Sequence, residues 1–81
     1  MTLLDLSEGA VVKIVKLQGG AALADRLHAF GLFTGSRVWL VKAAPFRGPL
    51  LVEEMTTGAR VMIGRGVAGK IEVSDGDPAR S

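Results

Sequence analysis

The 81-residue chain carries ten basic and eight acidic residues, a net charge of +2, and 48% hydrophobic against 22% charged residues. This length fits one domain with a compact core and leaves little room for an internal substrate cavity. The composition is too apolar for a disordered chain, and the absence of cysteine excludes disulfides, thiolate zinc sites, iron–sulfur clusters and a cysteine nucleophile.

The N-terminus shows neither a signal-peptide nor a transit-peptide pattern, and no apolar run is long enough to span a bilayer, so we expect a cytoplasmic protein that is not membrane-embedded.

The first predicted elements lie on either side of Gly9. Leucines before Gly9 predict one turn that acts as a lid. Residues 10–17 are predicted to form a strand with Val12 and Ile14 on one face, and Lys16 predicts a β-bulge because it breaks the alternation.

A helix is predicted over residues 21–30. Leu23, Leu27 and Phe30 follow the i, i+4, i+7 spacing of one helix face. Gly31 stands where a left-handed residue ends a helix, and Leu32 supplies the apolar residue that follows such a cap.

The rest of the chain predicts four strands separated by turns that contain glycine or proline. These strands span residues 37–44, 50–55, 59–64 and 70–73, and a single helical turn at 65–69 precedes the last one. We therefore expect a mainly β fold, a small, partly open barrel of about five strands with one helix between strands 1 and 2. One domain is expected over residues 1–75, with a disordered tail at 76–81 that has no apolar anchor.

The sequence lacks the residue groups that catalysis or metal binding requires. His28 is the only histidine, and with Asp25 at i, i+3 it offers two ligands where a stable metal site needs three or four. Glu53 and Glu54 are adjacent on a predicted strand, so they point to opposite faces and cannot share a proton. No glycine-rich phosphate loop is complete. We predict no enzymatic activity, no catalytic residues, no cofactor and no metal site.

A partner-binding exterior is what remains. Trp39 falls on the strand face opposite its apolar neighbours, and Phe46 with Arg47 sits at a loop apex, a common place for contacts. Burial of Trp39 under the helix or the lid, and packing of Phe46 against the barrel rim, are the alternatives. The residues predicted to contact a partner are Leu23, Arg26, Trp39, Phe46, Arg47 and Met62.

An ordered set of motifs resembles the FeoA family, ferrous iron transport protein A. The two most specific pieces are Arg-Leu-x-x-Phe-Gly-Leu-x-x-Gly at 26–35 and Ala-Pro-Phe-Arg-Gly-Pro-Leu at 44–50. Shorter pieces complete the set, namely Leu6-x-x-Gly9, Val12-x-Ile14, Val38-x-Leu40, Val61-x-Ile63 and Ala68-x-x-Ile71-x-Val73. The resemblance covers about residues 3–73. Trp39 is larger than expected for the family, and Gly-Arg-Gly-Val at 64–67 replaces a more polar turn.

This resemblance implies an SH3-like domain in a cytosolic bacterial protein. It also implies that the chain assists ferrous iron uptake by binding and tuning the cytoplasmic, G-protein-containing part of the FeoB transporter, without itself being the iron channel.

Other interpretations stay open. The basic pI of about 9.5 and the small barrel also fit a nucleic-acid-binding domain, although the cations are dispersed and few aromatics could stack on bases. Similar motifs occur in the SH3-like domain of metal-dependent repressors of the diphtheria-toxin-repressor type, but we expect a free-standing form because no helix-turn-helix reader precedes the barrel. Open edge strands could also pair two copies into a homo-oligomer.

Overall fold

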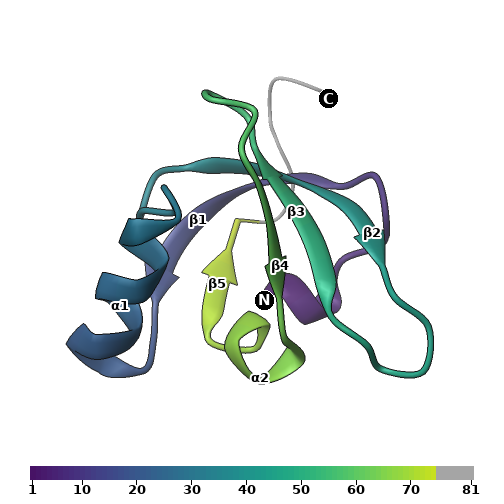
Figure 1. Ribbon diagram of the computed structural model, residues 1–81, viewed down its shortest axis with the longest axis horizontal. Coiled ribbons are helices and arrows are strands. Elements are labelled where there is room, and N and C mark those ends of the chain that lie inside the picture. Colours follow the sequence, from purple (N-terminus) through teal and green to yellow (C-terminus); the bar gives the residue numbers. More distant parts are fainter. Residues whose placement is uncertain (75–81) are drawn as a thin grey trace.

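The chain folds around five antiparallel strands in the spatial order β4–β3–β2–β1–β5 (Figure 1). A computed structural model describes residues 1–74; the tail predicted at 76–81 lies outside them. The strands are β1 (Val11–Leu17), β2 (Arg37–Ala43), β3 (Leu50–Glu54), β4 (Arg60–Ile63) and β5 (Ile71–Val73). Each begins and ends within one residue of its predicted bounds.

Helix α1 (Gly20–Ala29) connects β1 to β2, and the single turn α2 (Arg65–Ala68) connects β4 to β5. The expectation of a mainly β fold with five strands and one helix between the first two is therefore confirmed. Figure 1 shows the sheet curling so that β5 and α2 lie within its concave side, while α1 flanks it.

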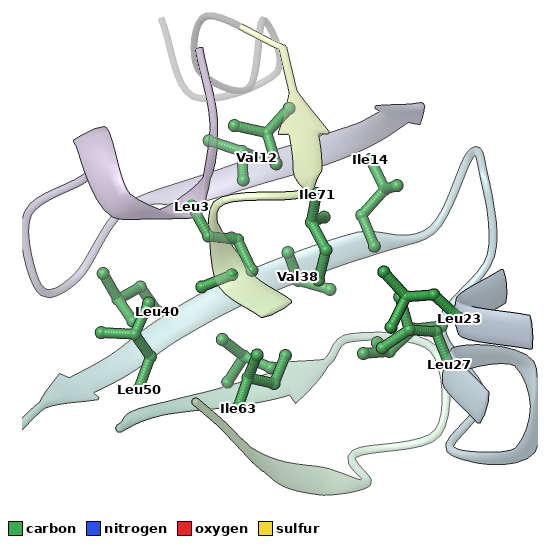
Figure 2. Close-up of a cluster of buried hydrophobic side chains, with 14 residues drawn as sticks. Leu3, Val12, Ile14, Leu23, Leu27, Val38, Leu40, Leu50, Ile63 and Ile71 are labelled. Atoms are coloured by element: carbon green, nitrogen blue, oxygen red, sulfur yellow. The ribbon is translucent and has the colours of Figure 1, made fainter. Parts of the chain in front are cut away.

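Strand alternation fills the core that this curl encloses (Figure 2). Val12 and Ile14 of β1 face the same interior as Val38 and Leu40 of β2, as the alternation predicts. Leu23 and Leu27 of α1 close one end of this cluster. The remaining buried aliphatic residues are Leu3, Leu32, Leu50, Val52, Ile63, Ala68, Ile71 and Val73.

The C-terminus of α1 has the predicted glycine cap. Gly31 adopts a φ of 84°, and its N–H donates to the carbonyl of His28 at 2.9 Å while the N–H of Leu32 donates to that of Leu27 at 2.9 Å. Phe30, expected on the same face as Leu23, lines the same groove as Leu23 but is 50% exposed. It is the C-cap residue with a φ of −91° and a ψ of 2°, so the regular helical projection has ended before it.

The N-terminal segment covers the outer edge of β5. The short 3-10 helix η1 (Leu3–Asp5) is capped by Thr2, and Leu3 is buried, which agrees with the predicted lid. Thr2 forms a β-bridge with Glu72, and the N–H of Val73 donates to the carbonyl of Met1 at 2.9 Å. The backbone groups at the outer edge of this end strand thus find partners within the chain.

Two irregularities bend the sheet. The register of β1 shifts between Ile14 and Lys16, as the broken alternation predicts. A second shift, between Leu40 and Lys42 of β2, leaves no clear mark in the sequence. It changes the alternation near the end of β2, so that Lys42 lies opposite Leu51 at the start of the β2–β3 hairpin.

The turn between β3 and β4 is organised by a buried carboxylate. Glu54 is 5% exposed, and its Oε1 accepts hydrogen bonds from the N–H groups of Thr56 and Thr57 at 3.0 and 2.9 Å. Burial, the largest single influence, raises the pKa of Glu54, but the combined hydrogen bonds from Thr57 and Thr56 outweigh it and hold the pKa below its usual value. Glu53 points the other way and pairs with Arg60 at 2.9 Å, so the two carboxylates are separated as expected.

Replacement Glu54→Gln should destabilise the domain by about 1–2 kcal/mol at neutral pH, because a neutral amide is a weaker acceptor for these donors. The folded-state pKa is depressed, so the stabilisation by Glu54 is complete above the pKa of a glutamate in the unfolded chain and is lost as the pH falls through the folded value. Urea unfolding of both proteins from pH 7 to pH 3 measures this, and the gap between them should close on acidification. A gap that stays constant to pH 3 would contradict the assignment.

Candidate partner-binding surface

The β2–β3 hairpin ends in a turn that holds two bulky residues in the left-handed region. Phe46 and Arg47 have φ values of 58° and 61°, and the N–H of Gly48 closes the turn onto the carbonyl of Pro45 at 3.1 Å. Positive φ at both central positions is the pattern of a type I′ turn, where Asn-Gly is preferred. A Cβ at Gly48 would lie 2.8 Å from that of Ala44, so glycine is needed at this position.

Phe46 is 98% exposed and so leaves its ring uncovered at the tip. A bulky residue in the left-handed region costs about 1–2 kcal/mol in backbone energy. Because the Phe46 ring is almost fully exposed, packing of the ring does not offset that cost. Strain of this kind, concentrated at an exposed aromatic, is typical of binding elements.

A first apolar groove lies beside this tip on the outer face of the sheet. Its floor includes Leu51 of β3 and Met62 of β4, which are direct cross-strand neighbours. The remaining lining residues are Lys42, Ala44, Pro45 and Pro49. The β2–β3 loop therefore forms one wall of the groove, and the sheet forms its base.

A second groove separates α1 from β4. One side of α1 contributes Leu23, Arg26 and Leu27, which follow the i, i+3, i+4 spacing of a single helix face, and the C-cap residue Phe30 continues this wall. The opposite wall and the end are formed by residues 61–64 and Val67. Met62, which is 61% exposed, lines both grooves, and β4 runs between α1 and the β2–β3 hairpin (Figure 1). We call the two grooves and the hairpin tip together the β4-edge surface.

Only cations accompany the apolar residues of the β4-edge surface. Arg26 lines the α1–β4 groove, Lys42 lines the outer groove, and Arg47 is exposed at the hairpin tip. No Asp or Glu lines either groove. The surface is thus suited to an apolar partner that carries negative charge.

The structure brings five of the six predicted contact residues to the β4-edge surface. Phe46 and Met62 are strongly exposed, and the alternative in which Phe46 packs on the rim does not occur. Leu23 is only 9% exposed and presents just its edge to the groove. These five residues are Leu23, Arg26, Phe46, Arg47 and Met62, and their part in binding stays a prediction.

Trp39 lies apart from both grooves. It is half-buried on the outer face of β2, and the guanidinium of Arg60 sits 5.7 Å from the centroid of its ring. Arg60 is in turn paired with Glu53, which is the cross-strand neighbour of Trp39. This layer of Arg60 and Glu53 lies beside the indole on the outer face of the sheet.

Sequence reasoning did not predict most of the residues that line these grooves. Phe30 was assigned only to the same helix face as Leu23, and Leu51 and Val67 were not named as contacts. The alternation of β3 does place Leu51 opposite the buried Val52, but an outward leucine becomes part of a groove only once β4 and the hairpin lie beside it.

Within residues 1–74, no three His, Asp or Glu side chains gather where they could hold a metal ion. His28, in the last turn of α1, stacks on Phe33 with 4.6 Å between ring centroids. No helix in this part of the chain is long and apolar enough to cross a membrane.

Comparison with known proteins gives a consistent family. Residues 1–75 match the family model described as the FeoA domain. A curated protein of Methanocaldococcus jannaschii, named "Putative Fe(2+) transport protein A", is 33% identical over 70 residues, which are 86% of this chain and 80% of that protein.

Solved structures agree with this family. An iron uptake regulatory protein (FeoA) is 26% identical with a TM-score of 0.79, over 90% of this chain and 92% of its own. The FeoA protein of Chlorobium tepidum is also 26% identical, with a TM-score of 0.81, over 90% of this chain and 68% of its own. A manganese-dependent transcriptional repressor, 20% identical with a TM-score of 0.82, shares the fold alone, and this chain spans 35% of it.

The strain at the hairpin tip generates a prediction about stability. The double replacement Phe46→Asn with Arg47→Gly should raise the free energy of unfolding by about 1 kcal/mol, because both residues suit a type I′ turn. Thermal unfolding should show a melting temperature higher by about 4–8 °C. Phe33→Asn, which replaces a half-exposed phenylalanine outside the positive-φ region, is the control and should bring no gain. A less stable double variant would show that the tip is not strained.

Proposed function

Because this chain belongs to the FeoA domain family, we propose that it is an accessory protein of ferrous iron transport that binds the cytoplasmic, G-protein-containing part of a FeoB-type transporter. The chain then acts in the cytoplasm and tunes the transporter by contact, without catalysing a reaction of its own. The family match over residues 1–75 carries this proposal, since it connects the chain to iron transport along nearly its whole length.

The β4-edge surface supports the proposal with a physical means of binding. A strongly exposed phenylalanine, an exposed methionine and two apolar grooves form a surface whose burial by a partner is favourable. The exposed Arg26 and Arg47 of this surface steer the approach of an acidic partner and limit the choice of partners.

Titration of the purified chain with the isolated cytoplasmic domain of the transporter, monitored by calorimetry, should give a dissociation constant in the range of about 1–100 μM, as expected for a small regulatory interface. The titration is repeated with GDP, with a non-hydrolysable GTP analogue and with Fe²⁺. Absence of binding under all of these conditions would refute the proposed partner.

The variant Phe46→Ser should weaken this binding at least about tenfold, because a buried phenylalanine contributes about 1.5–3 kcal/mol. Phe33→Ser is the matched control, since Phe33 is also exposed but lines neither groove. Equal affinities of the two variants would remove the hairpin tip from the interface. The rate of GTP hydrolysis by the transporter domain, with and without the chain, separates activation from inhibition.

A further inference from the structure

The outer edge of β4 is open, in contrast to that of β5. Both are end strands of the sheet, but Met1 and Thr2 pair with Glu72 and Val73 and so cover the edge of β5. Among residues 1–74 no segment pairs with the corresponding edge of β4. An end strand of this kind presents a row of unpaired N–H and carbonyl groups.

The register of the β3–β4 ladder identifies these groups. The N–H of Glu54 donates to the carbonyl of Ala59 at 2.8 Å, which makes this a hydrogen-bonded pair. In an antiparallel ladder such pairs alternate, so Val61 also bonds toward β3, opposite Val52. The N–H and carbonyl groups of Arg60 and Met62 therefore point away from β3, toward the open edge.

The α1–β4 groove lies along this edge. Residues 61–64 form its strand wall, and the helix face from Leu23 to Phe30 forms the other wall. Side chains of an added strand alternate between two sides, and every second one would enter this groove. The groove and the open backbone groups thus fit the same kind of ligand, an extended polypeptide.

The charges around the edge restrict the sequence of that polypeptide. Arg26 is exposed on the helix wall, and no acidic residue lines the groove. Arg65, directly after β4, has a buried Nε that finds no hydrogen-bond partner within residues 1–74. Within residues 1–74 neither Arg26 nor Arg65 forms a salt bridge, so a carboxylate on the incoming segment would balance these two cations.

We propose that an extended segment of the partner adds to β4 as a sixth strand. Its backbone pairs with Met62, its alternate apolar side chains fill the α1–β4 groove, and an acidic side chain faces Arg26. Backbone pairing supplies the affinity in this mode, and the groove supplies the specificity. The inference rests on the proposed function for the identity of the partner, and it adds the mode of recognition.

Hydrogen exchange of single amides tests the pairing directly. The ¹⁵N-labelled chain is mixed with saturating cytoplasmic domain of the transporter, and amide exchange is followed by NMR. The Met62 amide, free of the β3 ladder, should exchange at least about tenfold more slowly in the complex. The Val61 amide is the internal control, since it is already bonded to β3 and should change much less.

Three variants separate the backbone, side-chain and charge contributions. Met62→Pro removes the outward N–H without touching a β3 hydrogen bond, and should weaken binding at least about tenfold. Met62→Leu keeps the N–H and an apolar side chain, and should bind within about threefold of the unmodified chain. Arg26→Glu should weaken binding about tenfold and make it less sensitive to salt.

The outcomes are distinguishable. Failure of the unmodified chain to bind would overturn the proposed partner and, with it, this inference. Binding without slowed exchange at Met62 would overturn the sixth strand and leave the proposed function standing. If Met62→Pro does not fold, the exchange measurement on the unmodified chain and the Arg26→Glu titration decide the matter.

Discussion

Strand β1 belongs to both halves of the fold, and the rest of the structure depends on this sharing. Its first part, from Val11 to Lys13, pairs with β2, and its second part, from Ile14 to Leu17, pairs with β5. The bulge between Ile14 and Lys16 turns the strand from one partner to the other. Because β1 is shared, the sheet curls around a core in which Ile14 and Ile71 are both fully buried.

The same arrangement leaves one side of the curl without a strand partner. β5 is occupied by β1 on one edge and by the N-terminal segment on the other, so β4 cannot pair with it and the barrel stays open there. The turn α2 bridges the opening with Ala68 packed inside, and α1 flanks it. The β4-edge surface exists because no further strand in the described part of the chain, residues 1–74, fills the space between β4 and α1.

A small core tolerates little further loss of stability, yet this chain keeps two costly residues at its most exposed turn. Phe46 and Arg47 both combine positive φ with an exposed side chain, while nearby Gly48 is constrained only by space. A domain with about 5–15 kcal/mol of net stability sustains such strain when the displayed side chains contribute to binding. In the other hairpin of the sheet, the buried Glu54 carboxylate accepts hydrogen bonds from the backbone of two threonines and so closes the turn between β3 and β4.

The sequence by itself determined the local elements and their inward faces. Strand alternation placed Val12, Ile14 and Ile63 inside, and Gly31 ended α1. Both features follow from residues that are adjacent in the sequence, because they depend on the two-residue side-chain period of a strand and on the backbone conformation at a helix end. It also supplied the family resemblance and five residues of the β4-edge surface. Only the tertiary structure decided the strand order, the burial of Glu54, the exposure of Phe30 and the separation of Trp39 from the grooves. Phe30 and Met62 are far apart in the sequence, and they line one groove only because β4 packs beside α1 through contacts that no local pattern encodes.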